Sequence, residues 1–341
     1  MNPNPSHLTE YLDGTTADPS PAIARAAAIL RAGGTVAFPT ETVYGLGANA
    51  LDPQAVARIF TAKQRPSWDP LIVHVCDPVM LASIAVVSPQ AQRLMDAFWP
   101  GPLTLLLPRT PAIPDAVTSS RPLVGVLMPA HPLALALIRA TGLPIAAPSA
   151  NRFGHTSPTT AAHVLDDLDG RINAILDGGP TSVGLESTVF DPATNTLYRP
   201  GAVTPAMLET ITGPITLFQP PQHPAQPESL PSPGVGIRHY APHATLLLVK
   251  DQSTLDQQIS RLSQRGERVG VMLPHGWSAP PTTETYPWAH WDEPSGLAHR
   301  LFSGLRHLDQ RGVTYILCPL PEAHGIRLAI RDRLLKAART S

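Results

Sequence analysis

Short apolar segments alternate with helical patterns through the first 210 residues of the chain. Residues 20–34 open on a Ser-Pro pair, place apolar residues at helical spacing and end at two glycines, and the apolar segment 35–40 follows. Because alternating strands and helices form a sheet that helices cover, this pattern predicts an α/β domain with a largely buried sheet. Further strands are predicted at 70–76, 103–108, 123–129, 143–149, 174–179 and 187–191, and further helices at 52–64, 88–98, 131–141 and 159–168.

A Pro-dense stretch around residues 215–245 divides the chain of 341 residues into two parts. It shows no usable periodicity and predicts a semi-rigid linker over 215–244, after a first domain over 1–214. Beyond the linker, three apolar segments alternate with three helical patterns, which predicts a small Rossmann-like three-layer domain over 245–341. That domain has no G-x-G-x-x-G loop, so no dinucleotide site is expected in it.

Charge and motif content argue against several classes of protein. The formal charge is −1 and aromatic residues make up 5%, whereas a dedicated nucleic-acid binder carries a basic excess. No H-E-x-x-H, C-x-x-C, P-loop or G-x-S-x-G motif occurs, so zinc enzymes, P-loop NTPases and α/β-hydrolases lose support.

Apolar runs in the chain are all short. None reaches membrane-spanning length, and the N-terminus lacks a basic start followed by an apolar stretch, so we expect a cytoplasmic protein with no membrane partner. Cys76 and Cys318 each lie inside one of these runs, and both are expected to be buried thiols rather than metal ligands.

A first polar cluster stands at the end of the predicted strand 35–40. It contains Thr40, Glu41, Thr42 and Tyr44. Strand ends in open α/β sheets are where ligands bind, but a polar loop whose hydroxyls cap the next element explains the pattern equally well. Glu41 could serve as a general base, although the sequence shows no partner for it.

A second cluster pairs Lys63 with Arg65 at the end of a predicted helix. The chain has three lysines among its 25 basic residues, and a point-charge donor beside a forked one suits phosphate oxygens. The alternative is that these cations stabilise the helix C-terminus. His74 lies in the apolar strand that follows, where a histidine is more often a satisfied core residue than a catalyst.

A third cluster places Ser149, Asn151, Ser157 and Thr159 between a strand end and a helix start. Hydroxyls, an amide and free N–H groups there form an uncharged cradle for an anion, although Ser157 could simply cap the helix. Arg199 stands in a Pro/Gly-flanked turn, from which it could reach a phosphate or only solvate a loop. Together the clusters predict one polar, partly basic cavity for a small anionic ligand.

Eight segments in register resemble the YrdC-like family of L-threonylcarbamoyladenylate synthases. They are GGTVAFPTETVYGLGANA, KQRPSWDPLIVHV, FWPGPLTLLLP, MPAHPLALALI, LPIAAPSAN, SPTTA, ILDGGPTSVGLESTVFD and LYRPGAVT. The motif GIRHYAPH and the last domain resemble the long form of that family. The resemblance therefore covers nearly the whole chain, and it implies a YrdC-like twisted mixed sheet flanked by helices.

The resemblance also implies a reaction and its participants. L-Threonine, bicarbonate and ATP, which is accompanied by Mg²⁺, would be condensed into threonylcarbamoyl-AMP and pyrophosphate. The product would pass to a separate tRNA-modifying transferase complex that forms threonylcarbamoyladenosine in tRNAs reading ANN codons. Direct tRNA binding is possible in such a protein but not required.

The resemblance assigns roles to individual positions of this chain. Lys63 and Arg65 match the family's K-x-R pair, which is expected to hold the ATP phosphates and to neutralise charge as pyrophosphate leaves. The other matches to nucleotide-binding positions are Ser149, Asn151, Ser157, Arg199, His239 and Tyr240, the last two on the linker motif, which would fold over the nucleotide as a lid. The matches to the threonine pocket are Thr40, His74, Ala147 and Ser187.

Position 127 departs from the family pattern. Relatives commonly read V-R-M-P where this chain has Val126-Leu127-Met128-Pro129, so an arginine expected to face the threonine carboxylate is missing. A lost charge-assisted contact is worth roughly 1.5–3 kcal/mol. Two alternatives stay open: a carbamoyl-adenylate enzyme that uses another amino compound, and an RNA-binding, translation-associated module.

Overall fold

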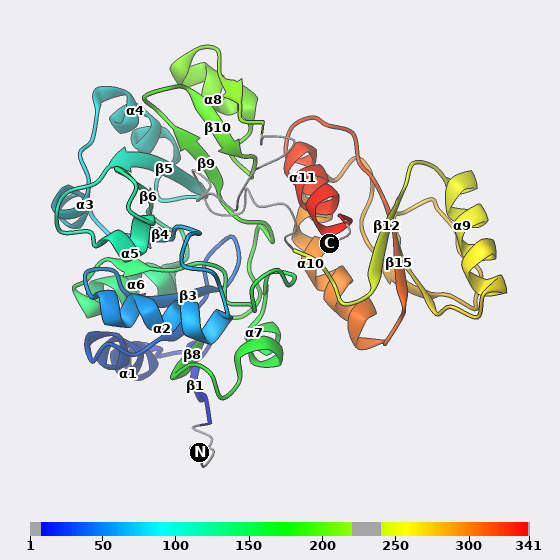
Figure 1. Cartoon of the computed structure of the whole chain (residues 1–341), viewed down its shortest axis with the longest axis horizontal. Helices are drawn as coiled ribbons and strands as arrows, with labels where there is room; N and C mark the ends of the chain where they lie inside the picture. The colour runs from blue at the N-terminus through cyan, green and yellow to red at the C-terminus, as the bar shows by residue number, and fades with distance from the viewer. Residues whose placement is uncertain (1–7, 220–239, 340–341) are drawn as a thin grey trace. The chain divides into compact units, whose positions relative to one another are not determined.

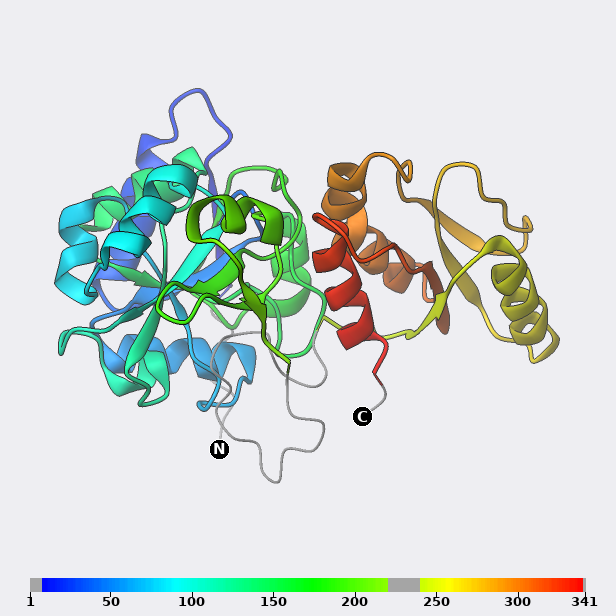
Figure 2. The ribbon, with the colours of Figure 1, turned by 90° about the horizontal axis from the view of Figure 1, so that it is seen from above.

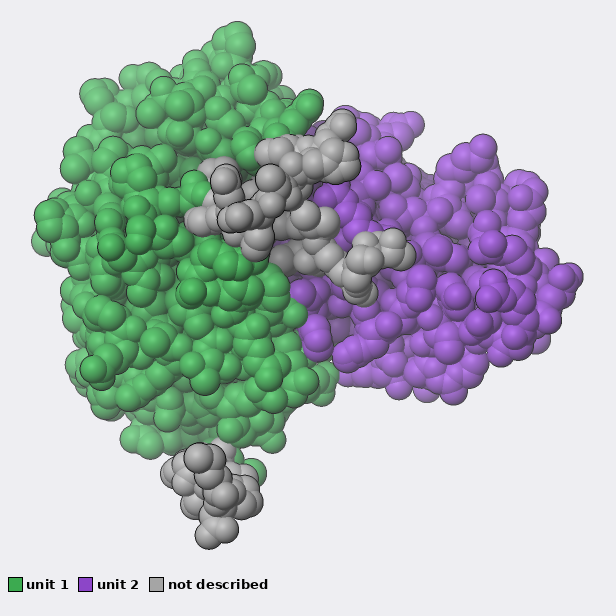
Figure 3. Space-filling view, viewed as in Figure 1, with its two compact units in different colours: residues 1–153, 158–182, 186–235 green, residues 154–157, 183–185, 236–341 purple. Residues whose placement is uncertain are grey.

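The computed structural model describes residues 8–219 and 240–339. These residues belong to two compact units, coloured separately in Figure 3. Unit 1 comprises Met1–Phe153, Pro158–Ser182 and Glu186–Val235, and unit 2 comprises Gly154–Ser157, Val183–Leu185 and Gly236–Ser341. Most of the predicted linker lies outside the described residues, so its boundaries stay a prediction.

The described part of unit 1 forms an 11-stranded mixed sheet in the order β1-β8-β2-β3-β7-β4-β6-β5-β9-β10-β11 (Figure 1). Its strands are β1 (Glu10–Asp13), β2 (Val36–Phe38), β3 (Gly45–Asn49), β4 (Ile72–His74), β5 (Leu103–Pro108), β6 (Leu123–Leu127), β7 (Ile145–Ala146), β8 (Ala174–Asp177), β9 (Thr188–Asp191), β10 (Thr196–Arg199) and β11 (Thr216–Leu217). The predicted mixed α/β sheet is confirmed. Four of its strands were not predicted: the glycine-containing β3 and the short strands β1, β10 and β11.

Helices lie on both sides of this sheet (Figure 2). One core is formed with α2 (Pro53–Lys63), α3 (Pro78–Ile84), α4 (Pro89–Phe98), α5 (Asp115–Thr118), α7 (Ala161–Leu168) and α8 (Pro205–Thr212). The opposite face of the sheet packs against α1 (Ser20–Arg31) and α6 (Pro132–Thr141). Beyond α6 that second face continues with a small apolar cluster of strand residues around Leu127.

Proline fixes where many of these helices begin. Asp52, Asp77, Ser88 and Thr204 each cap a helix by accepting a backbone N–H, and each is followed by a proline. A proline at the first helical position loses no hydrogen bond there and presets the helical φ. Some of the chain's 40 prolines therefore fix the residue at which a helix begins.

Unit 2 contains a four-stranded parallel sheet in the order β12-β15-β13-β14. Its strands are β12 (Thr245–Val249), β13 (Val269–Leu273), β14 (Glu284–Pro287) and β15 (Tyr315–Pro319). The helix α9 (Gln252–Gln264) lies on one side of the sheet, and α10 (Pro294–Gln310) and α11 (Arg327–Ala337) lie on the other (Figure 1). The three-layer prediction is confirmed, but β14, a half-exposed edge strand without apolar alternation, was missed.

Two further predictions concern burial and membranes. Cys76 and Cys318 are free and buried, as expected. Within residues 8–219 and 240–339, no helix has both the length and the apolar character needed to span a bilayer.

Candidate active site

Lys63 and Arg65 stand where α2 ends and the backbone turns. Gln64 between them adopts a left-handed conformation (φ 54°), and the Arg65 N–H donates to the Phe60 carbonyl at 3.0 Å. The turn brings both cations into the interior, where Lys63 is 1% and Arg65 7% exposed. Cations that only stabilise a helix C-terminus usually remain exposed to solvent, so the burial of Lys63 and Arg65 argues against that role.

The Lys63 ammonium is held by main-chain carbonyls. Its Nζ donates to the Ser149 carbonyl at 2.5 Å and to the Asn151 carbonyl. Burial lowers the pKa of Lys63 well below its usual value, Arg65 lowers it further, and the carboxylates of Asp167 and Asp69 only partly oppose this. A buried ammonium short of negative charge is stabilised by an incoming anion, so phosphate oxygens are favoured here.

Asp69 is the carboxylate around which the cations gather. Arg65 Nη2 lies 3.0 Å from an Asp69 carboxylate oxygen, and both side chains are buried. Burial raises the pKa of Asp69, whereas Arg65, Lys63 and Arg199 each lower it. Three cations therefore act on one carboxylate. The Arg65 Nε is buried and has no hydrogen-bond partner among the described residues, which leaves a donor for a ligand.

Arg199 is the last residue of β10 and is 4% exposed. Its Nε donates to the Ser187 carbonyl at 2.9 Å, and its Nη2 donates to the Ser187 hydroxyl at 3.0 Å. The Ser187 hydroxyl in turn lies 2.7 Å from the Thr104 hydroxyl. The interpretation of Arg199 as a residue that only solvates a loop is therefore wrong.

Strand register places two residues of the predicted threonine pocket, His74 and Ala147, on one face of the sheet together with Leu127. His74 in β4 pairs with Leu127 in β6 and with Ile145 in β7. Ala147, two residues beyond Ile145, donates its N–H to the Ile72 carbonyl at 2.8 Å. Because paired residues share a face and side chains alternate along a strand, His74, Leu127 and Ala147 project from the same face.

The same face continues toward Arg199. Gly125 in β6 pairs with Leu106 in β5, which puts Thr104 on this face. Thr104 pairs with Val189 in β9, and Val189 pairs with Arg199 in β10. Arg199 and His74 thus project from the same face of the sheet, although several strands separate them.

His74 is a buried imidazole that is not fully satisfied. It is 5% exposed, its ring meets the Phe38 ring edge-to-face at 5.8 Å, and its Nδ1 has no hydrogen-bond partner among the described residues. Burial lowers the pKa of His74 to about 4, so the ring is neutral at pH 7. Buried ring nitrogens usually have a hydrogen-bond partner. The unpaired Nδ1 of His74 is therefore available to a polar ligand, unlike the nitrogens of a fully hydrogen-bonded core histidine.

Backbone pairing joins the first and third polar clusters. The Leu46 N–H donates to the Pro148 carbonyl at 2.7 Å, and the Ala150 N–H donates to the Tyr44 carbonyl at 2.8 Å. Gly45 and Ser149 form a bridge between these contacts. The loop that starts at Thr40 and the segment that holds Lys63 are therefore neighbours.

Within the first cluster, hydroxyl and carboxyl groups hold their own loop. The Thr40 hydroxyl donates to the Val43 carbonyl at 2.6 Å and accepts the Thr42 N–H at 3.1 Å, as the polar-loop interpretation expects. One Glu41 carboxylate oxygen accepts the Ala130 N–H at 3.0 Å, while the other is buried with no partner among the described residues. Burial raises the pKa of Glu41.

The remaining predicted nucleotide ligands divide between the units. Ser149 and Asn151 lie with Lys63 in unit 1, whereas Ser157 and Tyr240 belong to unit 2. The Tyr240 ring stacks on the Phe302 ring at 5.8 Å with the Arg333 guanidinium 5.2 Å from its centroid. His239 lies outside the described residues, so the lid stays a prediction.

Two residues of the site were missed in the sequence. Asp69 follows Lys63 and Arg65 by a few positions, and a carboxylate so close to a cation pair, just before a buried strand, could have been recognised. Thr104 was detectable as the one polar residue of the apolar segment LTLLLP. Among the described residues, no three His, Cys, Asp or Glu side chains gather to hold a metal ion.

Fold and site define an α/β protein with buried cations suited to an anionic ligand. The family described as "Telomere recombination", with the model name Sua5_yciO_yrdC, matches residues 28–201, and the family "Threonylcarbamoyl-AMP synthase, C-terminal domain" matches residues 203–339. The chain belongs to the Sua5/YciO/YrdC family and carries both of these domains.

Relatives match over nearly their full length. Threonylcarbamoyl-AMP synthase of Bacillus subtilis is 45% identical, with 93% of each chain covered, and that of Pyrococcus abyssi is 42% identical, with 92% of this chain and 93% of the relative covered. The crystal structure of P. abyssi Sua5 complexed with L-threonine is 40% identical with a TM-score of 0.90, covering 97% of this chain and 98% of that one. The predicted family and fold are thereby confirmed.

Proposed function

We propose that this chain is a threonylcarbamoyl-AMP synthase, a nucleotidyltransferase that converts L-threonine, bicarbonate and ATP into threonylcarbamoyl-AMP and pyrophosphate. The observation that carries the proposal is that three buried cations, Lys63, Arg65 and Arg199, act on the buried Asp69 carboxylate, with which Arg65 forms an ion pair at 3.0 Å. The full-length similarity to enzymes of that name supports the same reaction.

The cations act on the phosphates of ATP. Lys63 and Arg65 would hold phosphate oxygens and neutralise the charge that develops as pyrophosphate leaves. Arg199, held by two hydrogen bonds to Ser187, adds a third positive charge that acts on Asp69. Mg²⁺ would enter with ATP, because this ion keeps its waters and is usually bound through substrate phosphates.

The amino acid binds on the sheet face that carries His74, Ala147 and Ser187. The threonine nitrogen attacks the carbon of bicarbonate, a C–N bond forms, and water leaves to give a carbamate. A carbamate oxygen then attacks the α-phosphorus as the bond to pyrophosphate breaks. The neutral His74 ring can accept a hydrogen bond from the amine or the hydroxyl, which orients the nucleophile.

The reaction product needs a consumer outside this chain. Threonylcarbamoyl-AMP is a mixed anhydride that water hydrolyses, so a transferase that modifies tRNA has to receive it soon after release. We place this step in the cytoplasm and expect it to form threonylcarbamoyladenosine in tRNAs that read ANN codons. His239 and Tyr240 are proposed to help retain the nucleotide, and direct tRNA binding by this chain is not required.

Leu127 favours a second candidate, an enzyme of the same chemistry with another amino substrate. Its side chain is 2% exposed and packs with Ile72, Leu106 and Val189, so no charge faces a carboxylate from this position. A substrate without a carboxylate at that point would bind this chain as tightly as it would bind a relative with arginine at position 127.

One assay separates these candidates. The protein is incubated with MgATP and bicarbonate plus L-threonine, L-serine or no amino acid, and pyrophosphate and the carbamoyl-adenylate are measured, the latter by mass. The proposal requires threonine-dependent formation of both products in equal amounts. Pyrophosphate release that ignores threonine would refute it, and a strong preference for another amine would support the second candidate.

A further inference from the structure

Unit 2 contains a hollow of about 500 Å³ that the proposed reaction does not use. Its lining residues all come from segments that follow the carboxyl ends of the four parallel strands: Lys250, Trp277, Trp291, Asp292, Leu320, Pro321, Glu322 and Arg327. Ligands of open α/β sheets bind at this edge, and the volume is in the usual range for small-molecule sites. We infer that the hollow is a second ligand site, for a nucleotide.

Two tryptophans supply faces on which a planar ring can stack. The rings of Trp277 and Trp291 lie 6.0 Å apart, and Trp291 also packs at 6.1 Å against the buried Trp288, whose indole N–H donates to the Leu297 carbonyl at 2.9 Å. No hydrogen bond to a described residue occupies the indole N–H of Trp277 or Trp291. Half-buried tryptophans with a free N–H are typical of binding surfaces.

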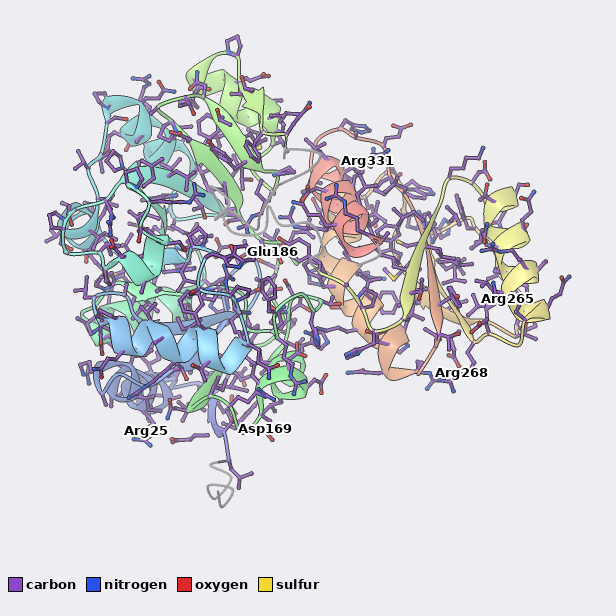
Figure 4. The ribbon with its side chains drawn as sticks, viewed as in Figure 1. Arg25, Asp169, Glu186, Arg265, Arg268 and Arg331 are labelled. Atoms are coloured by element: carbon purple, nitrogen blue, oxygen red, sulfur yellow. The ribbon has the colours of Figure 1, made fainter. Side chains whose placement is uncertain are left out.

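Polar contacts fix the loops that carry these rings. The Gln252 side chain donates to the Ser278 carbonyl at 2.8 Å and accepts the Ser278 N–H at 3.0 Å, next to Trp277. Arg327 donates to the Trp291 carbonyl, and Arg331 of α11, labelled in Figure 4, donates to the Pro321 carbonyl at 2.9 Å. The hollow is therefore preformed, which lowers the entropic cost of binding.

The charges around the rings match the parts of a nucleotide. Lys250 is 83% exposed and its nearest carboxylate, that of Asp251, is 3.9 Å away, so the ammonium is available to a phosphate. The Arg327 Nε is buried without a partner among the described residues. Asp292 and Glu322 offer oxygens to ribose hydroxyls, and the tryptophans offer stacking to the base.

This assignment is independent of the proposed function. It does not require a glycine-rich loop, because stacking and side-chain cations replace the backbone cradle of dinucleotide sites. The nucleotide could be free or part of a single-stranded RNA, and both present the same base, ribose and phosphate. A monosaccharide would stack on the same rings but would leave Lys250 and Arg327 without an anion.

The test uses the full chain carrying Lys63→Ala, which weakens phosphate binding in unit 1. AMP is titrated by calorimetry, and 8-azido-AMP is photocrosslinked and its attachment mapped by peptide mass. We expect labelling between residues 277 and 327. Adding Trp291→Leu should weaken AMP binding by about tenfold or more, whereas Trp291→Phe should largely restore it. Lys250→Ala should weaken it by about two- to fivefold, because water and salt screen this exposed ammonium, and the matched control Arg265→Ala, at the end of α9 (Figure 4), should not.

A single-stranded adenosine decanucleotide distinguishes the source of the nucleotide. Anisotropy binding that is tighter than for AMP and is lost in Trp291→Leu assigns the site to RNA, and binding of AMP alone assigns it to a free nucleotide. Labelling confined to unit 1, AMP affinity that ignores both Trp291→Leu and Lys250→Ala, or heat with glucose but none with AMP would each overturn the inference. Threonine-dependent turnover in Trp291→Leu stays normal, so failure here does not touch the proposed function.

Discussion

The two candidate sites present positive charge in opposite ways. In unit 1, Lys63 and Arg65 are 1% and 7% exposed and lie among main-chain carbonyls and buried carboxylates. In unit 2, the Lys250 side chain is 83% exposed and tryptophan rings line the hollow. Charge interactions are strong in a buried site and weak where water and salt screen them. Unit 1 is therefore built to act on charged, reacting phosphates, and unit 2 is built to bind mainly by stacking.

The largest effect is expected from the buried cations. Replacing Lys63 or Arg65 by Ala should lower turnover by about a hundredfold or more, because charge on leaving pyrophosphate loses its stabilisation. Threonine-dependent pyrophosphate release measures this, and Arg93→Ala on the exposed surface of α4 is the control. If both alanine variants keep wild-type rates, the buried cations of unit 1 do not act on the reacting phosphates, and the contrast with unit 2 fails.

The burial of His74 predicts a pH dependence of stability. Its pKa is about 4 in the folded chain against 6.5 when exposed, so only the unfolded chain takes up a proton between these values. Stability is therefore unaffected above pH 7 and is lost as the pH falls from 6.5 toward 4, by up to about 3 kcal/mol.

Urea unfolding at pH 7, 5.5 and 4.5 measures this loss for the wild type and for His74→Gln. The slope of stability with pH should be shallower in the variant. The exposed His307→Gln serves as the control and should keep the wild-type slope. Equal slopes in the wild type and His74→Gln would contradict a neutral, buried imidazole in unit 1.

The variant Leu127→Arg tests whether position 127 of unit 1 faces the carboxylate of the amino-acid substrate. The new guanidinium would project from the same face as His74, its partner in β4, and should tighten threonine binding about ten- to a hundredfold. Calorimetric titration with threonine measures the change, and Leu127→Met controls for altered packing. Unchanged or weaker binding in a folded Leu127→Arg variant would argue against a carboxylate contact at this position.

The smallest effect is expected from Thr104→Val. This change removes the hydroxyl that lies 2.7 Å from the Ser187 hydroxyl, and Ser187 orients Arg199. One buried hydrogen bond is worth about 1 kcal/mol, so the KM for ATP should rise about fivefold while kcat changes little. A fall in kcat with an unchanged KM would mean that the Thr104–Ser187–Arg199 chain acts on chemistry rather than on binding.

The sequence predicted the parts of the fold that carry strong periodicity. The helices α1, α2, α4 and α6 and the strands β4, β5 and β6 lie where apolar spacing placed them, because their burial is encoded within each segment. The strands β3, β10, β11 and β14 were missed, because these short segments show no clear apolar alternation. The strand β1 was missed because a partner distant in the chain creates it. β1 pairs with β8, more than 160 residues away.

The candidate site was predicted by residue type but not by environment. Lys63, Arg65 and Arg199 were all identified, yet the sequence left a surface interpretation open for each. The contacts of Lys63 with Ser149 and Asn151 are made by tertiary structure, and those of Arg199 with Ser187 depend on the pairing of β9 with β10; the sequence shows neither. The hollow of unit 2 was not predicted, because its tryptophans lie in loops after strands, where no periodic signal exists.

A crystal structure of the protein with MgATP and L-threonine tests the account most directly. We predict phosphate oxygens within hydrogen-bond distance of Lys63 Nζ and of the Arg65 and Arg199 guanidinium groups, with threonine on the sheet face beside His74. A triphosphate bound away from these three cations, while turnover is retained, would contradict the account.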